Sequence, residues 1–376
     1  MCILTDTEIV AVEGTPGNFK VTLEKKPRYV DTEKCVACDK CVSACPVETL
    51  DAYNANLTNR KAIYINVPTV YPQIYVIDEG ACKFHECAKC VEVCPTNAIN
   101  LDEKIEKITL NVGSIVVATG FKEFDPSIIK EYHYDEYPDV ITNLELARMI
   151  DDFGPTNGRI IRPSNGKPAK RIVFIQCAGS RDRRYNPYCS SICCMISLKN
   201  ASLIKESNPD SEITVCYIDI RTTGREHEYY YEKARELGIK FVKGRPTEIY
   251  ADEDKGKLTV DVEDALLSRF LDLEADLVVL ATAMVPPEGT QELAELLGID
   301  LDEDGFFKEY NAKLRPTETK QRGTYLCGGA TFPKDAPTAS LHAHSAAIKA
   351  TKFLINSKII KDQRTAIVND EYCGDC

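Results

Sequence analysis

The sequence predicts an α/β protein that carries a small cysteine-rich module within its first third. Strand-like stretches alternate with helix-like stretches over the second half of the chain, which is typical of parallel α/β sheets. Two segments, 113–120 and 276–283, echo each other as buried strands running into Ala-Thr-Gly and Ala-Thr-Ala. Cysteines gather in two similar runs between residues 35 and 94. The 376 residues suffice for roughly two to three domains.

The composition is that of a globular protein, with 44% hydrophobic and 28% charged residues. Lys and Arg number 46 against 58 Asp and Glu, a net charge of −12, so the basic surface that a phosphate backbone requires is missing and nucleic acid is not an expected partner. No apolar run approaches the roughly 20 residues that span a bilayer, and the first residues lack the pattern of a signal peptide. We therefore expect a cytoplasmic protein without a membrane span.

The 17 cysteines are the most unusual feature of the chain. They are odd in number and clustered, and no export signal accompanies them, which indicates metal binding rather than a disulfide framework. The first run has the spacing C-x2-C-x2-C-x3-C-P that is typical of bacterial ferredoxins. Its cysteines are Cys35, Cys38, Cys41 and Cys45. In such a run the first three thiolates bind one [4Fe-4S] cluster and the fourth binds a neighbouring cluster.

A second run supplies the expected neighbour, although its first gap is widened to four residues. Its cysteines are Cys82, Cys87, Cys90 and Cys94. We call it the crossed rule that the fourth cysteine of each run binds the cluster of the other run. This rule predicts one cluster on Cys35, Cys38, Cys41 and Cys94, and another on Cys82, Cys87, Cys90 and Cys45. The wider gap leaves open whether Cys82 or His85 is the ligand. Zinc is the alternative metal, but zinc sites use separated Cys-x2-Cys or Cys/His pairs and need no third cysteine followed by Cys-Pro.

A third group of cysteines lies in the α/β body. It consists of Cys177, Cys189, Cys193 and Cys194, within eighteen residues of sequence. Four thiols suffice for one more cluster, but adjacent cysteines point in different directions on a regular backbone, so the cage would be irregular. The alternative is a redox-active or merely buried pair. Cys216 alternates with apolar neighbours in a strand-like stretch, and we expect it in the core.

The body is predicted to contain a series of strands and helices. Strands are expected at 171–176, 213–220, 240–242, 247–250 and 258–262, and helices at 193–206, 226–237 and 338–354. In parallel α/β domains that bind a nicotinamide cofactor, a G-x-G-x-x-G motif binds the pyrophosphate of that cofactor. This sequence has no such motif after the strand at 171–176 or anywhere else. At the position where that motif would follow the strand, the sequence has Cys177, the first cysteine of the third group. We infer that a metal site replaces a nicotinamide site there.

The two echoing segments resemble the crossing points of thioredoxin-reductase-type flavoproteins, where the chain leaves the flavin domain and later returns. The predicted fold is therefore a two-dinucleotide-domain flavoprotein body of that type with an inserted two-cluster ferredoxin domain. The segment RGTYLCGGA at 322–330 and the following helix resemble the part that closes over the flavin ring. Side-chain-free Gly328 and Gly329, and the helix N-terminus near Ala336, suit close approach to flavin oxygens. A plain structural Gly-Gly turn is the alternative.

Four further motifs make the resemblance specific. QCAGSRD, NPYCSSICCM, GFFKEYNAKLRPTET and PKDAP, together with the inserted module, resemble the A subunit of heterodisulfide reductases over essentially the whole chain. The resemblance implies an FAD that splits electron pairs between two acceptors, with iron–sulfur clusters as wires. It implies a third [4Fe-4S] cluster on Cys177, Cys189, Cys193 and Cys194, and a catalytic Lys199 near flavin N5. The implied flavin contacts are Thr119, Gly120, Cys327, Gly328, Gly329, Lys334, Asp335, Ala336 and Pro337.

Both ends of the sequence depart from the family pattern. The βαβ unit that holds the FAD adenosine is not seen before residues 8–12, and Cys373 and Cys376 look like the start of a second ferredoxin domain. We expect another chain to complete the FAD site, or flavin to bind weakly or not at all. The predicted segments are 1–30 (flavin domain), 31–105 (ferredoxin module), 106–160 (flavin domain), 161–285 (third cluster), 286–360 (flavin domain) and 361–376 (second ferredoxin domain).

The leading hypothesis is an electron-transferring iron–sulfur/FAD subunit of a heterodisulfide-reductase-like complex. The expected partners are disulfide-reducing subunits, a hydrogenase or formate dehydrogenase, a ferredoxin, and a chain that completes the FAD site. A flavin-free iron–sulfur relay scaffold is the second hypothesis. A ferredoxin-dependent NAD(P)H oxidoreductase like the small subunit of glutamate synthase is a third, weakened by the missing pyrophosphate loop.

Overall fold

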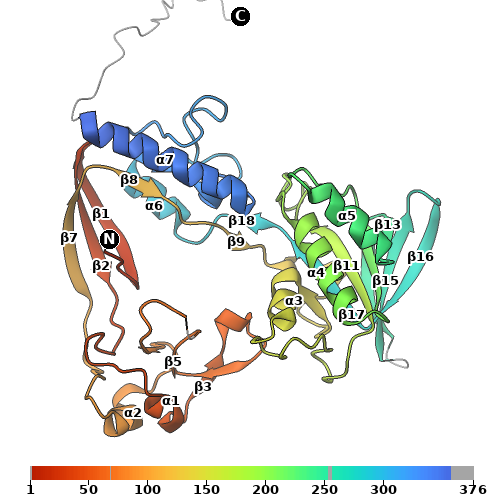
Figure 1. Ribbon diagram of the computed structural model, residues 1–376, viewed down its shortest axis with the longest axis horizontal. Helices are drawn as coiled ribbons and strands as arrows, with labels where there is room; N and C mark the ends of the chain where they lie inside the picture. Colours follow the sequence, from red (N-terminus) through yellow and green to blue (C-terminus); the bar gives the residue numbers. More distant parts are fainter. Residues whose placement is uncertain (1, 68, 253–255, 357–376) are drawn as a thin grey trace, which may run out of the picture.

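A computed structural model of the chain describes residues 2–67, 69–252 and 256–356, in which three connected parts are visible (Figure 1). A cysteine-rich module lies at one end of a long antiparallel ribbon, the helix α7 lies at the ribbon's other end, and a second α/β unit lies to the side. Cys373, Cys376 and the predicted segment 361–376 lie outside the described residues.

The antiparallel ribbon consists of β1 (Thr7–Thr15), β2 (Asn18–Lys25) and β7 (Glu106–Val112). Phe19, Val21 and Leu23 alternate as buried residues along β2, as expected for a strand with one packed face. β2 and β7 pair from Phe19↔Val112 to Lys25↔Glu106. The chain therefore enters the cysteine-rich module from one strand and returns through the strand beside it.

The module contains two short helices, α1 (Lys40–Ala44) and α2 (Lys89–Val93), which lie side by side (Figure 1). Each helix begins after a residue in the left-handed conformation, Asp39 or Ala88, and each ends at a cysteine. The two cysteine runs therefore fold as a repeated loop–helix unit. The short strands between them are β3 (Glu48–Leu50), β4 (Asn59–Lys61), β5 (Ile63–Tyr64) and β6 (Val76–Ile77).

The first part of the body is built on β8 (Ile115–Val117) and β19 (Thr324–Leu326), which are parallel neighbours. The helix α7 (Ala336–Asn356) packs against β19, and α6 (Thr290–Leu297) contacts β1. The helix predicted at 338–354 is confirmed as α7. The strand predicted at 113–120 is shorter than expected.

The second part contains β10 (Val140–Thr142), β17 (Leu277–Thr282), β11 (Arg171–Ala178), β12 (Glu212–Tyr217) and β13 (Lys240–Lys243), which form a parallel sheet in that order. The sheet-packing helices are α3 (Asn143–Ile150), α4 (Cys193–Ser207) and α5 (His227–Glu236). β14 (Pro246–Asp252), β15 (Lys257–Asp264) and β16 (Arg269–Ala275) form an antiparallel sheet beside it. The predicted α4, α5, β11, β13, β14 and β15 are thereby confirmed, and Cys216 is fully buried in the core as expected.

The residues that follow the two echoing segments meet in space. Directly after β8, the chain forms β9 (Lys122–Glu123), and directly after β17 it forms β18 (Met284–Val285). These short strands pair antiparallel, Glu123 with Met284, and form the link between the two parts of the body (Figure 1). Over the described ranges, none of the helices combines the length and apolarity needed to cross a membrane.

Candidate iron–sulfur and flavin sites

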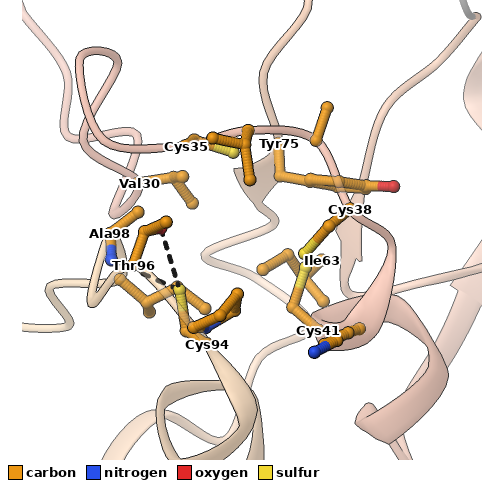
Figure 2. A pocket seen from close by; sticks show the side chains of 14 residues that line it. Val30, Cys35, Cys38, Cys41, Ile63, Tyr75, Cys94, Thr96 and Ala98 are labelled. Atoms are coloured by element: carbon orange, nitrogen blue, oxygen red, sulfur yellow. Dashed lines mark hydrogen bonds between the residues drawn. The ribbon is translucent and has the colours of Figure 1, made fainter.

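The first cavity of the module is lined by one cysteine set that spans both runs. The four cysteines are Cys35, Cys38, Cys41 and Cys94, and Figure 2 shows their side chains around the cavity. The loop before α1 passes through left-handed Ala37 and Asp39, which lets it curl around the cavity. Apolar Val30 and Ile63 line the cavity as well. The structure therefore brings together the four cysteines that the crossed rule assigns to the first cluster.

Cys94 approaches this cavity from the end of α2. Its Sγ accepts the backbone N–H of Ala98 at 3.3 Å and lies 3.8 Å from Thr96 Oγ1 (Figure 2). Burial alone would raise the pKa of Cys94, but these donors, Ala98 first, outweigh it and lower the pKa. Burial raises the pKa of Cys41 to about 12. Donors to sulfur and an apolar wall are features that stabilise and tune cysteine-bound clusters.

The second cavity repeats this arrangement. Its cysteines are Cys45, Cys82, Cys87 and Cys90. Cys45 arrives from the end of α1, and Phe84 closes one wall. Burial raises the pKa of Cys90 to about 11. These are the four cysteines of the second predicted cluster.

The widened gap in the second run forms a short 3-10 turn, Phe84–Glu86. The turn keeps Cys82 at the cavity, where its Sγ accepts the N–H of Phe84 at 3.3 Å. His85 turns outward, and its Nε2 lies 3.0 Å from Asp102 Oδ1. Of the two residues that the sequence left open, Cys82 is the one that lines the cavity.

The donor set of both cavities suits a cluster rather than a lone ion. In each, four cysteines surround an apolar space. A cubane has its own inorganic core, which its thiolates surround. The residues present therefore fit [4Fe-4S] clusters.

The third cysteine group also comes together. Cys177 is the last residue but one of β11 and has a left-handed conformation, and Cys193 and Cys194 begin α4. Burial raises the pKa of Cys177 to about 11, and the next largest cause is the neighbouring Cys194. Burial also raises the pKa of Cys193, followed by the effects of Cys177, Cys194 and Cys189. The four thiols are close enough to act on one another electrostatically, and a bound metal cluster would hold them as thiolates in spite of their burial.

Hydrogen bonds fix the loop between Cys177 and α4. Ser180 Oγ and Ser190 Oγ lie 2.9 Å apart, and Ser190 Oγ accepts the N–H of Met284 at 2.9 Å. Gly179 has a φ of +76°, and a Cβ there would lie 2.5 Å from the Phe124 ring. Only glycine fits this position. The loop therefore packs closely against Phe124, which directly follows β9 in the link between the two parts of the body.

The candidate flavin residues fall at one edge of the β8–β19 pair. Thr119 and Gly120 follow β8, and Cys327 to Gly329 follow β19. A Cβ on Gly329 would lie 3.5 Å from the Gly120 carbonyl carbon, so the two glycines are neighbours. Cys327 is buried against α7 among Tyr325, Ala346 and Ala350. Its predicted contact with the flavin stays a proposal.

The start of α7 gathers polar groups beside these glycines. Asp335 Oδ1 accepts the N–H of Thr338 at 2.8 Å and caps the helix, with Ala336 and Pro337 exposed in its first turn. Lys334 Nζ donates to Thr331 Oγ1 at 2.6 Å, and burial lowers the pKa of this lysine. His342 Nδ1 is buried and has no hydrogen-bond partner among the described residues. An unpaired buried nitrogen beside a half-buried lysine fits an acceptor-rich group such as a flavin ring.

Lys199 lies on the exposed side of α4, between buried Leu198 and Asn200. No hydrogen bond or ion pair joins it to any other described residue. Its predicted place near flavin N5 stays a proposal that rests on the family resemblance alone.

Sequence reasoning missed two charged residues beside the third cysteine group. Arg181 Nη2 pairs with Asp219 Oδ2 at 2.8 Å, and the Asp219 carbonyl lies 3.8 Å from Cys194 Sγ. The strand β12 ends at Tyr217 and not at residue 220 as predicted, so Asp219 lies in the loop that follows it. Arg181 is part of the QCAGSRD motif, and that motif could have indicated from the sequence that Arg181 lies near the site.

The fold and these sites define an α/β protein with a ferredoxin-type iron–sulfur module. The family described as "4Fe-4S binding domain" matches residues 28–51, which include the first cysteine run. Over its whole length the chain is homologous to the A subunits of heterodisulfide reductases. It is 46% identical to an iron–sulfur A subunit of the CoB–CoM heterodisulfide reductase of Methanopyrus kandleri, over 100% of this chain. It is 42% identical to the A subunit of the H(2):CoB-CoM heterodisulfide,ferredoxin reductase of Methanothermobacter thermautotrophicus, again over 100% of this chain.

The chain spans 57% of the length of both relatives. Among solved structures, the thioredoxin reductase of T. acidophilum is similar with a TM-score of 0.42 and 17% identity, over 67% of this chain and 69% of that one. The thioredoxin reductase of Lactococcus lactis has a TM-score of 0.43 and 16% identity, over 78% of this chain and 86% of that one.

Proposed function

We propose that this chain relays electrons as the iron–sulfur and FAD subunit of a heterodisulfide-reductase-like oxidoreductase complex in the cytoplasm. One observation carries the proposal: each of two cavities in the module is lined by three cysteines of one run and one of the other. This crossing holds two clusters close together, because each run contributes to both sites. Adjacent clusters in one small module form a path for single electrons.

The third cysteine group extends the path into the body. Cys177, Cys189, Cys193 and Cys194 would bind a further [4Fe-4S] cluster beside the link between the two parts of the body, since Cys193 Sγ lies 3.4 Å from the carbonyl of Thr282 at the end of β17. The module contacts the same unit, because Arg148 of α3 donates to Asn54 of the module at 3.0 Å. These contacts support a relay from the module through the third site.

The FAD would lie at the edge of β8 and β19. Thr119, Gly120, Gly328 and Gly329 offer backbone without bulky side chains, and the N-terminus of α7 offers N–H groups. A bound flavin supplies the exchange between electron pairs and single electrons. Lys334 and His342 would donate hydrogen bonds to it. Lys199 is proposed as the residue near flavin N5, by family resemblance.

The proposed partners follow from the relatives, whose names include heterodisulfide, ferredoxin, hydrogen and formate. We propose disulfide-reducing subunits, a ferredoxin and a hydrogenase or formate dehydrogenase as neighbours. Splitting of electron pairs between two acceptors is part of this proposal.

Iron and flavin content of the complex isolated without oxygen tests the proposal. We expect about twelve iron atoms per chain, four for each of three clusters, and about one flavin. Cys216→Ser is the matched control, because Cys216 is buried in the core and belongs to none of the three proposed cluster sites. The iron content of this variant should equal that of the parent protein. Eight iron atoms or fewer would contradict the third site.

A flavin-free relay scaffold is the second candidate function. The cysteines that line the two module cavities would suffice for it, because single electrons pass between clusters without a flavin. Acid release of a yellow chromophore at about one per chain excludes this alternative. Full iron content without the chromophore supports it over the leading proposal.

A further inference from the structure

Arg181 holds an unusual position beside the third cysteine group. Its backbone N–H donates to the carbonyl of Tyr188 at 2.9 Å, within the loop that leads to Cys189. Its Nη2 pairs with Asp219 Oδ2 at 2.8 Å. Its Nη1 is buried and makes no hydrogen bond of ordinary geometry with another described residue, although the guanidinium lies close enough to the Cys177 thiol to act on it as a hydrogen-bond donor. A buried guanidinium N–H without an acceptor is costly, so the position calls for an acceptor that occupies the site in the working protein.

The cysteines are the groups that Arg181 faces. Its charge acts on Cys177 and Cys189, and it also lowers the pKa of Cys194 against the larger effect of burial. Asp219 connects the two sides, since its carboxylate holds Arg181 and its carbonyl lies 3.8 Å from Cys194 Sγ. Three of the four proposed ligands therefore lie within the field of one guanidinium.

We propose that Arg181 is a positioning residue that sets the reduction potential of the third cluster by donating its free N–H to the cluster's sulfur atoms. This inference rests on the proposed function, because it needs a cluster on Cys177, Cys189, Cys193 and Cys194. Reduction adds one electron and one negative charge to the cluster. A buried cation and a hydrogen bond to sulfur both stabilise the added charge, so Arg181 raises the potential. No proton moves in this step, since arginine stays protonated.

Three variants separate this role from a general effect of charge. Arg181→Gln removes the charge and the forked donor. Arg181→Lys keeps the charge but cannot hold Asp219 and donate to sulfur together. Arg221→Gln is the matched control, because Arg221 is exposed and its charge also acts on Cys194. Solvent screens an exposed charge, so its removal should matter little.

The experiment is a mediated redox titration of the anaerobically purified complex, followed by electron paramagnetic resonance of each cluster. With one electron per cluster, Arg181→Gln should need a potential about 59 mV lower for half-reduction of the third cluster, a tenfold drop in the reduced-to-oxidised ratio. Arg181→Lys should fall between that value and the parent, and Arg221→Gln should match the parent. The two module clusters should not change in any variant.

The outcomes distinguish this inference from the proposed function. If the parent protein contains iron for only two clusters, the third-site proposal fails and this inference falls with it. If three clusters are present and the Arg181→Gln potential equals the parent's, or shifts no more than that of Arg221→Gln, only the role of Arg181 is overturned. If Arg181→Gln loses the third cluster, the reduction potential of that cluster is measured in Arg181→Lys instead. A potential equal to the parent's in Arg181→Lys overturns the inference.

Discussion

Arg148 of the body and Asn54 of the cysteine-rich module are joined by two hydrogen bonds. Arg148 Nε and Nη2 donate to Asn54 Oδ1 at 3.1 and 3.0 Å. The guanidinium also lies over the Tyr53 ring, 4.9 Å from its centroid. Arg148 is on α3, which contacts α4, the helix that begins with two of the third group's cysteines. This contact fixes the module against the unit that carries the third site.

Removal of that contact should loosen the module. In Arg148→Ala, we expect amide exchange of residues 51–57 to rise about fivefold, because charged hydrogen bonds of this kind contribute roughly 1 kcal/mol when partly exposed. Hydrogen–deuterium exchange followed by mass spectrometry measures this. Arg159→Ala is the control, since Arg159 Nε donates only to the carbonyl of Thr156. Equal exchange in the parent and both variants would show that Arg148 does not hold the module.

The crossed ligand sets predict which cysteine pairs share a cluster. Cys38→Ala combined with Cys94→Ala should lose about four iron atoms, because both residues line the first cavity. Cys94→Ala combined with Cys90→Ala should lose about eight, although these residues are only four apart in sequence. Iron analysis of the two double variants measures the difference. The reverse order of losses would mean that each run holds its own cluster.

Gly179 should be required for the third site. Gly179→Ala places a Cβ 2.5 Å from the Phe124 ring at a φ of +76°, and we expect the loop to shift and about four iron atoms to be lost. Gly166→Ala is the matched control, because Gly166 has a φ of +70° and open space around its Cβ position. That variant should incur only the backbone cost of about 1 kcal/mol and keep its iron. Full iron content in Gly179→Ala would contradict the close fit.

The buried carboxyl group of Glu123 should make the free energy of unfolding depend on pH. Burial raises its pKa above the ordinary 4.5, and hydrogen bonds from Thr282 and Thr142 offset only part of this. A raised carboxyl pKa means that the folded protein holds the proton more tightly than the unfolded chain, so stability falls as pH rises from 4.5 through the folded pKa. Glu123→Gln should remove this fall and raise the apparent melting temperature at about pH 7.

Glu131 provides a control of opposite sign. Its pKa is lowered from 4.5, first by a backbone hydrogen bond and then by Arg184, so its ionised form stabilises the fold. Glu131→Gln should therefore leave the melting temperature at about pH 7 unchanged or lower it, since the side chain is partly exposed. Melting curves of the intact protein at about pH 5, 6 and 7 compare the two variants. A lower melting temperature for Glu123→Gln at neutral pH would refute the argument.

Local sequence signals predicted much of the fold. The buried strands β11 and β17 are mostly apolar runs, the helices α4 and α7 repeat small and apolar residues at helical spacing, and spacing alone grouped the module's cysteines as the structure does. The helix α3 was missed although its signal was readable, because Thr142 and Glu145 form a capping box at its start. The contacts of Asn54 with Arg148 and of Arg181 with Asp219 join residues distant in sequence, so no local pattern shows them. Cys82 and His85 could not be separated from the sequence because they lie only three residues apart, and the direction of each side chain depends on the 3-10 turn Phe84–Glu86 between the second run's first two cysteines.

Mössbauer spectroscopy of ⁵⁷Fe-labelled complex shows directly whether cysteine thiolates of this chain bind three four-iron clusters. Nearly all iron should belong to [4Fe-4S] clusters, at about twelve atoms per chain, and about four should be lost in the Cys193→Ala variant. Zinc in place of iron, or an iron content that Cys193→Ala leaves unchanged, would rule out this set of clusters.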